Sequence, residues 1–276
     1  MQHTENTFTG HDGLKLFYQS WRPDTAPKAV LIIIHGLGEH SGRYLNFVKP
    51  LVAQGYAIYA CDNRGHGRSP GRRGYVNRFN EFQQDVIAFQ EVVTEQEGKR
   101  PLFLMGHSLG GLISLYTVLH NSSGLTGVIA SAPALDTGGI PAVLMATSKI
   151  LSHLKPNLTV PSGLDITAMS RDPKAVQAYQ ADPLIHSVGT PRLATESAAA
   201  IKWCLAHPGN LKIPILIIHG TDDRITSPIS SREFFDKLTI SDKTYINYEG
   251  GYHENHNDLH HAQATADIQA WLDAHL

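Results

Sequence analysis

Residues 101–120 read PLFLMGHSLGGLISLYTVLH and set a Gly-x-Ser-x-Gly motif, residues 106–110, between two different hydrophobic patterns. The run before the motif is short and continuously apolar, which is typical of a strand buried on both faces. After the motif, apolar residues from Leu112 to Leu119 recur at helical spacing. A strand, a sharp turn and a helix would lift the Ser108 hydroxyl above the edge of a sheet. The stretch therefore predicts a nucleophilic serine at a strand–helix junction.

The rest of the chain alternates between strand-like and helix-like patterns. The strand-like runs are Leu14–Tyr18, Ala29–Ile34, Ala57–Cys61, Leu102–Met105, Gly127–Ser131, Ile215–His219 and Thr244–Tyr248. Helical patterns lie at about 43–54, 79–96, 109–120, 228–238 and 258–275. This alternation predicts an α/β fold with a mostly parallel central sheet flanked by helices. Ligands of such sheets bind at the carboxyl ends of the strands.

One long segment interrupts the alternation. Residues 134–207 read as helices and loops without a convincing strand, and they are too many for one crossover helix. We expect them to form an inserted helical cap, with residues 1–133 and 208–276 forming the core. Its apolar residues at helical spacing are Ile140, Val143, Leu144, Ile150, Leu151 and Leu154. Two interpretations remain open: the stripe packs inside the cap, or it forms an apolar lid that contacts lipid and admits acyl chains.

Composition excludes several classes of protein. The 276 residues carry a formal net charge of −2 without a long basic block, so no nucleic-acid partner is expected. Two cysteines, Cys61 and Cys204, provide no disulfide framework. The N-terminal residues lack the apolar core of a signal peptide, and no apolar run approaches the ~20 residues of a membrane span. We expect a soluble, cytoplasmic protein whose contact with membranes, if any, is peripheral.

A serine nucleophile needs a base, and the base needs a carboxylate to orient it. Asp222 and Asp223 follow the strand-like run at 215–219, and His253 follows the run at 244–248. Serine, aspartate and histidine thus occur in the order expected of α/β-hydrolases. The residues by themselves do not decide between the two aspartates.

The tetrahedral oxyanion formed by serine attack needs two hydrogen-bond donors. The first is expected to be the backbone N–H of Leu109, directly after the nucleophile. The second is expected to be that of Leu37, in the loop HGLGE at 35–39. An ordinary glycine-containing turn would have the same sequence, and the presence of Ser108 favours the oxyanion interpretation. His253 and His256 do not fit the zinc-protease pattern, because position 257 is asparagine, and no metal site is predicted.

With these residues identified, the chain resembles the monoacylglycerol lipase and lysophospholipase branch of the α/β-hydrolases, which is also grouped with serine aminopeptidase-type hydrolases. The matching blocks are HGLGEHSGRY at 35–44, DNRGHGRS at 62–69, GHSLGG at 106–111, HGTDDRI at 219–225 and DKTYINYEGGYHEN at 242–255. In the expected cap, PNLTVP at 156–161, MSRD at 169–172 and AYQADPL at 178–184 also match. The blocks cover nearly the whole chain in the same order.

The resemblance implies roles for individual residues. The implied catalytic residues are Ser108, Asp223 and His253, with Leu37 and Leu109 as oxyanion donors. Asp223 is favoured over Asp222 because it stands directly before Arg-Ile, as the family's aspartate does.

The resemblance also implies a polar end of the substrate pocket. The matching residues are Glu39, Arg43, Tyr179 and His256, which correspond to residues around the glycerol moiety. For Glu39 and Arg43, a salt bridge that supports the turn is an equally good interpretation.

The implied reaction is hydrolysis of a monoacylglycerol to glycerol and fatty acid through an acyl-enzyme, with no metal or organic cofactor. The partner is a lipid ester, and the cap would touch a membrane surface transiently. The nearest alternative is a lysophospholipase or general carboxylesterase, which kinetics on the two lipid classes would distinguish. A prolyl-type aminopeptidase needs acidic residues to hold a free amine, for which Glu39 alone gives little support. A non-catalytic receptor on this fold would not need a complete triad.

Overall fold

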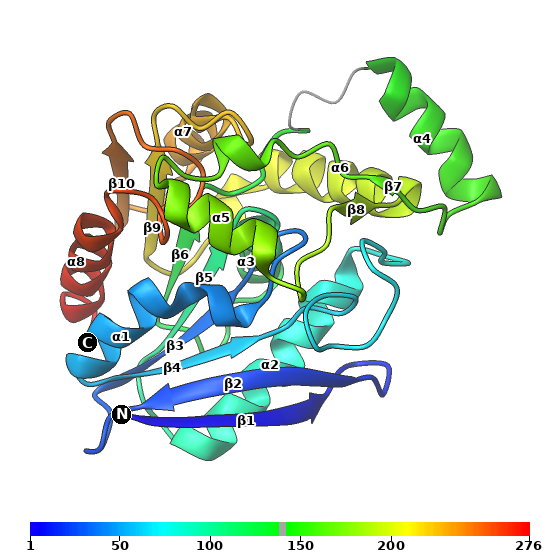
Figure 1. The fold of residues 1–276 in the computed structure, drawn as a ribbon. Coiled ribbons are helices and arrows are strands. Elements are labelled where there is room, and N and C mark those ends of the chain that lie inside the picture. Colours follow the sequence, from blue (N-terminus) through cyan, green and yellow to red (C-terminus); the bar gives the residue numbers. More distant parts are fainter. Residues whose placement is uncertain (138–141) are drawn as a thin grey trace.

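The computed structural model describes residues 1–137 and 142–276, and it is built around one mixed sheet (Figure 1). The strands of this sheet are β1 (Gln2–Thr9), β2 (Lys15–Arg22), β3 (Ala29–Ile34), β4 (Tyr56–Cys61), β5 (Leu102–His107), β6 (Gly127–Ser131), β9 (Ile215–Gly220) and β10 (Lys243–Tyr248). Their spatial order is β1-β2-β4-β3-β5-β6-β9-β10. β2 pairs antiparallel with β1 and β4, and all later pairs are parallel.

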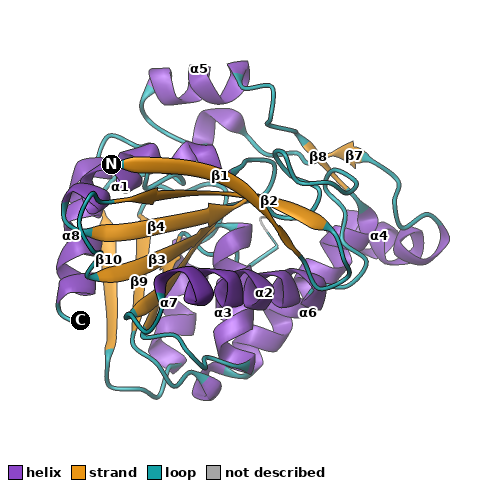
Figure 2. Ribbon diagram, turned by 90° about the horizontal axis from the view of Figure 1, so that it is seen from below, coloured by secondary structure: helices purple, strands orange, loops and turns teal. Residues whose placement is uncertain are grey.

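Helices cover both faces of this sheet (Figure 2). α1 (Leu45–Ala53) and α8 (His261–Asp273) lie on one face, and α2 (Asn80–Glu97), α3 (Leu109–His120), α6 (Pro191–Ala206) and α7 (Pro228–Lys237) lie on the other. α4 (Ala142–Leu154) and α5 (Pro173–Ala181) belong to the segment between β6 and β9. The mostly parallel sheet with flanking helices confirms the expected fold class.

The central strands separate two hydrophobic cores. Every residue of β3 is buried, and its side chains alternate between the cores. Val30 and Ile32 pack with α2 and α3, whereas Leu31 and Ile33 pack with α1 and α8. The continuous apolar runs of the sequence therefore reflect strands that are covered on both sides.

The first strand is absent from the sequence pattern. β1 pairs with β2 along its whole length, from Gln2 opposite Arg22 to Thr9 opposite Lys15. Seven of its eight residues are exposed, and only Phe8 is buried. An edge strand of this kind carries no apolar run, so hydrophobic periodicity does not reveal it.

The segment between β6 and β9 holds α4, α5 and α6, together with a short ladder that the sequence does not predict. The ladder joins β7 (Val160–Pro161) to β8 (Val188–Gly189) in antiparallel fashion. α6 contacts both α4 and α3, and its buried hydrophobic residues belong to the same core as those of α2 and α3. The division of the chain at residues 134 and 207 into core and cap stays a prediction.

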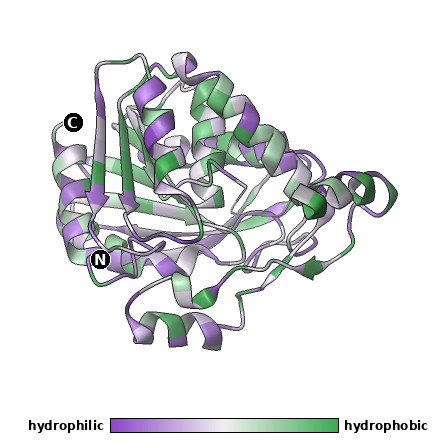
Figure 3. Ribbon diagram, turned by 90° about the horizontal axis from the view of Figure 1, so that it is seen from above, coloured by the Kyte–Doolittle hydropathy of each residue, from purple (hydrophilic) through white to green (hydrophobic). Residues whose placement is uncertain are grey.

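α4 projects from the body of the molecule and carries hydrophobic residues along its length (Figures 1 and 3). Val143, Leu144, Ile150 and Leu154 are 79, 55, 63 and 74% exposed, respectively. The interpretation that the apolar stripe packs inside the cap is therefore wrong for these four side chains, and Ile140 lies outside the described residues. Within the described part of the chain, no helix is both long and apolar enough to cross a bilayer.

Candidate active site

Ser108 occupies the sharp turn between β5 and α3. Its φ of 54° and ψ of −118° are values that L residues rarely adopt, and such strain clusters at functional sites. Two glycines make the turn possible. A Cβ on Gly106 would lie 2.0 Å from the Gly110 oxygen, and a Cβ on Gly110 would lie 2.1 Å from the Ile34 oxygen. The glycines thus let α3 begin directly against the ends of β5 and β3.

The loops after β9 and β10 bring a carboxylate to a histidine. His253 Nδ1 lies 2.7 Å from Asp223 Oδ2, and both side chains are buried. Asp222 is exposed, and its side chain has no contact with His253 among the described residues. Of the two adjacent aspartates, Asp223 is the one placed to orient the imidazole.

The Asp223 carboxylate is fully hydrogen-bonded. Oδ1 accepts the backbone N–H groups of Ile225 at 2.8 Å and Thr226 at 3.1 Å. Oδ2 interacts with the Thr226 hydroxyl at 2.9 Å, His219 Nε2 at 3.0 Å and His253. Burial would raise the pKa of this carboxyl, but the charge of His253 and the hydrogen bonds from both histidines hold the pKa well below its ordinary value. Asp223 is therefore an anion at neutral pH.

The same pair raises the pKa of the histidine. Burial would lower the pKa of His253, but the charge of Asp223 and its hydrogen bond outweigh that effect, with help from Glu254 and Glu39. The imidazolium is thus stabilised, which is the form that a histidine takes after it accepts a serine proton.

The nucleophile and the base are near neighbours without a direct bond. The ring of His107, which precedes Ser108, lies 4.6 Å from the ring of His253 between centroids. Among the described residues no hydrogen bond joins Ser108 Oγ to His253. Such bonds are often long in free enzymes and tighten when substrate binds.

Two backbone amides are available beside Ser108. A Cβ on Gly36 would lie 3.2 Å from Ser108 Cβ, so the loop after β3 runs next to the nucleophile. Within the described residues, the N–H groups of Leu37 and Leu109 donate to no other group. Leu109 also begins α3, whose N-terminus favours negative charge. The two amides predicted as oxyanion donors are free to serve in that role.

The residues predicted for the polar end of the pocket lie together around one guanidinium. Arg43 Nη1 lies 3.2 Å from Glu39 Oε2, and the guanidinium stands over the ring of Tyr179 at 4.6 Å. The two nitrogens Nη1 and Nη2 also donate to Glu254, at 2.5 and 2.9 Å. Glu254 was missed by the sequence analysis because nothing local relates it to an arginine 211 residues away, although it directly follows His253.

Glu39 also supports the loop that carries Leu37. Its Oε1 accepts the backbone N–H of Gly36 at 2.7 Å and the hydroxyl of Tyr44 at 2.7 Å. The interpretation of Glu39 as a turn support therefore has a structural basis.

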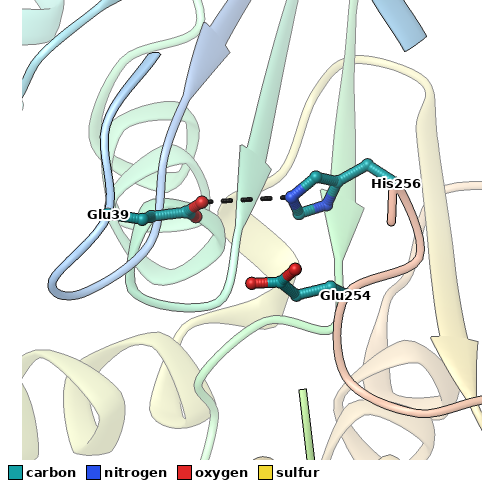
Figure 4. Close-up of side chains that lie close together, drawn as sticks. All are labelled: Glu39, Glu254 and His256. Atoms are coloured by element: carbon teal, nitrogen blue, oxygen red, sulfur yellow. Dashed lines mark ion pairs between the residues drawn. The ribbon is translucent and has the colours of Figure 1, made fainter. Parts of the chain in front are cut away.

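His256 is fully buried, and neither of its ring nitrogens has a hydrogen-bond partner among the residues that the structure describes. The ring stacks on Tyr44 at 4.2 Å, and Nε2 points toward Glu39 Oε2 at 3.9 Å (Figure 4). Burial, reinforced by the charge of Arg43, holds the pKa of His256 well below its ordinary value. The imidazole is therefore neutral, with one donor and one acceptor unused.

The donor set of this cluster suits an ion pair better than a metal. Glu39, Glu254 and His256 offer ligand atoms within 4.8 Å of one another (Figure 4). The guanidinium of Arg43 already neutralises charge on both carboxylates, and an added cation would be repelled by it.

Comparisons with known proteins cover almost the whole chain. A family described as serine aminopeptidase, S33 matches residues 25–260. Monoacylglycerol lipase of Mycolicibacterium smegmatis is 32% identical, with 99% of this chain and 98% of the relative covered. Human monoglyceride lipase is 31% identical, with 95 and 88% covered. The crystal structure of Paleococcus ferrophilus monoacylglycerol lipase has a TM-score of 0.87 at 33% identity, with 95 and 99% covered.

Replacement of the serine tests the nucleophile. Ser108→Ala is expected to lower kcat for a p-nitrophenyl ester by at least ~10³-fold, because attack and proton transfer act as one unit. Thermal unfolding should stay near that of the wild type, since only one hydroxyl is lost. Activity close to that of the wild type in the purified variant would contradict this role of Ser108.

A matched pair of substitutions tests the orienting carboxylate. Asp223→Asn is expected to reduce kcat by roughly 10³- to 10⁴-fold, because the imidazole loses the anion that fixes its tautomer. Asp222→Asn removes the same charge one residue away and should leave kcat within about twofold, as expected for an exposed side chain. Steady-state kinetics of both variants check the assignment, and the reverse pattern would show that Asp222 is the partner.

Proposed function

The chain belongs to the serine aminopeptidase S33 family, and from that premise we propose that it is a serine hydrolase of monoacylglycerols. The products are glycerol and a free fatty acid. The observation that carries the proposal is the buried Asp223–His253 pair beside the strained Ser108 turn. The similarity to monoacylglycerol lipases over nearly the full chain supports the choice of ester.

The reaction proceeds through an acyl-enzyme. Ser108 Oγ attacks the ester carbonyl while His253 takes its proton, and Asp223 stabilises the imidazolium. The carbonyl oxygen becomes an oxyanion that the N–H groups of Leu37 and Leu109 bind. His253 then gives the proton to the glycerol oxygen as the C–O bond breaks. A water molecule, deprotonated by His253, then attacks the acyl carbonyl carbon. The bond to Ser108 Oγ breaks, His253 returns the proton to that oxygen, and the fatty acid leaves.

The unpaired nitrogens of His256 favour an alcohol-binding role for the polar cluster. Buried polar groups without partners are rare, because each one costs free energy unless a ligand or water satisfies it. Glycerol hydroxyls both donate and accept, so they match a neutral imidazole beside the Arg43–Glu39 pair. We therefore assign the glycerol end of the substrate to the side of the site that His256, Arg43 and Tyr179 form.

The charges of this cluster disfavour a peptide with a free amine. A prolyl-type aminopeptidase would need a carboxylate available for the substrate ammonium group. Glu254 is engaged by two nitrogens of Arg43, and Glu39 is engaged by Arg43, Tyr44 and a backbone amide. A neutral polar leaving group fits these saturated carboxylates better than a cation does.

The exposed apolar residues of α4 support contact with a lipid surface. The described part of the chain leaves more than half of each of the four side chains exposed, and such apolar patches mark interaction sites. A helix that lies at the bilayer interface with its apolar side inserted would hold the enzyme where single-chain lipids are concentrated. We propose that the enzyme is cytoplasmic and that it binds membranes transiently through α4.

The glycerol assignment predicts a substrate-dependent effect of one substitution. His256→Phe keeps the ring that stacks on Tyr44 but removes both nitrogens. The ratio of kcat/KM for a monoacylglycerol to kcat/KM for a p-nitrophenyl ester of the same chain should fall about 5- to 30-fold, or about 1–2 kcal/mol.

Equal losses on the two esters would contradict the glycerol assignment. A lysophospholipid of the same chain belongs in the same panel. Faster turnover of that lipid by the wild type would make the protein a lysophospholipase, and the monoacylglycerol proposal would fail.

The membrane proposal predicts weaker vesicle binding when α4 loses apolar surface. Ile150→Ser combined with Leu154→Ser should reduce partitioning onto phosphatidylcholine vesicles by about tenfold or more, since burial of one such side chain contributes about 1.5–3 kcal/mol. Ile229→Ser on α7 is the matched control, because Ile229 is also exposed, at 69%. Co-sedimentation measures the partitioning. If the control loses as much binding as the α4 variant, contact through α4 is refuted.

A further inference from the structure

We propose that residues 168–186, called the clamp segment below, position the catalytic machinery rather than only cover it. The clamp segment belongs to the chain inserted between β6 and β9. It bonds on one side to the loop that carries His253 and on the other to the loop that carries Leu37. The inference rests on the proposed function, since it assigns these loops their catalytic tasks.

Asp258 is the centre of the first contact. Its carboxylate is completely buried and accepts the backbone N–H of Tyr252, the residue before His253, at 2.9 Å. The same carboxylate accepts the backbone N–H of Arg171 at 2.7 Å and its Nε–H at 2.9 Å. One side chain thus joins the histidine loop to the clamp segment.

The backbones of the two segments also run against each other. The N–H of Glu254 donates to the carbonyl of Met169 at 2.8 Å, and that of His253 approaches the carbonyl of Ala168 at 3.5 Å. The main chain of the proposed base is therefore bonded directly to the clamp segment. A shift of this segment would change the geometry of the His253–Asp223 pair.

The Asp258 carboxylate and Arg171 also belong to an ionic network. Burial would raise the pKa of Asp258, but hydrogen bonds from His260 and from the backbone of Tyr252 and Arg171 hold the pKa below its ordinary value. Arg171 also contacts His260 Nδ1 at 3.0 Å. Buried ion pairs can often be replaced by apolar residues without loss of stability, whereas they fix orientation through directional bonds.

The other side of the clamp segment holds the oxyanion loop. The N–H of His186 donates to the carbonyl of Gly38 at 2.9 Å. Gly38 has a φ of +80°, and a Cβ there would lie 2.3 Å from the His186 oxygen, so the two chains touch closely. Gly38 directly follows Leu37, whose N–H is a proposed oxyanion donor.

A side-chain bond reinforces this second contact. His40 Nδ1 accepts the backbone N–H of Gly42 at 3.1 Å, so the ring proton is on Nε2. That Nε2–H donates to Asp182 at 2.8 Å. The clamp segment thereby touches both the loop of the base and the loop of the oxyanion donor, the two groups that must be aligned on one substrate.

The test separates positioning from folding by kinetics. Asp258→Asn should lower kcat for a p-nitrophenyl ester about 10- to 100-fold with KM within about twofold, because small misplacement of a catalytic group is costly. The acid limb of kcat/KM reports the pKa of the base in the free enzyme. It should move to lower pH, because a looser Asp223 contact no longer holds that pKa up.

Four further variants complete the design. Arg171→Ala removes the clamp-side partner from a half-buried position and should reproduce both effects, whereas Arg171→Lys should restore most of kcat. The double variant Asp258→Asn, Arg171→Ala should have a kcat little below that of Asp258→Asn alone, as expected for one shared interaction. Asp267→Asn is the control. It removes a carboxylate on the neighbouring α8 that accepts the hydroxyl of Tyr248, and it should keep the wild-type kcat and acid limb.

Folded Asp258→Asn or Arg171→Ala protein with the wild-type kcat and an unshifted acid limb overturns the inference, even if its thermal stability is lower. If Asp258→Asn does not fold, the kcat and acid limb of Arg171→Ala and Arg171→Lys test the inference instead. Failure of the proposed function is distinguishable, since it would appear as absent monoacylglycerol turnover in the wild type or as retained activity in Ser108→Ala.

Discussion

The close approach of α3 to the ends of β3 and β5 is the constraint on which the rest of the site depends. No side chain fits between Gly110 and the carbonyl of Ile34, so the turn at Ser108 and the loop after β3 form one packed unit. The strained dihedral angles of Ser108 persist because these contacts over-determine them. Parallel pairing then brings the loops after β9 and β10 to the same edge, where Asp223 meets His253.

The parts of the fold and site that the sequence predicts are those with a local signal. Buried strands such as β3 and β9 leave continuous apolar runs, and the Ser108 turn leaves its glycines. β1 leaves no such signal, because one residue in eight is buried. The pairing of Arg43 with Glu254 joins residues 211 positions apart. The exposure of the apolar residues of α4 depends on how other segments pack around that helix. Both are tertiary facts that periodicity does not contain.

The buried charges around Arg43 combine support with recognition. Taking one guanidinium and two carboxylates out of water costs several kcal/mol per ion unless each is well bonded. Glu254 and Glu39 meet that cost through Arg43, Tyr44 and the amide of Gly36. The ring nitrogens of His256 take part in none of these hydrogen bonds. The charges of this cluster satisfy one another and the imidazole of His256 does not take part, which supports the proposal that uncharged hydroxyls bind there.

The inserted segment meets two opposite physical demands with two kinds of interaction. The residues at 168–186 contact the two proposed catalytic loops through directional bonds, which they donate to the Asp258 carboxylate and to the Gly38 carbonyl. α4 offers apolar area, whose burial is non-directional and tolerates variable depth and orientation. A lipid surface is fluid and can satisfy only the second kind, whereas ester attack needs atoms held to within a fraction of an ångström. In the roles proposed here, separation of the two kinds along the chain would let α4 adapt to lipid without disturbing the alignment of His253 and Leu37.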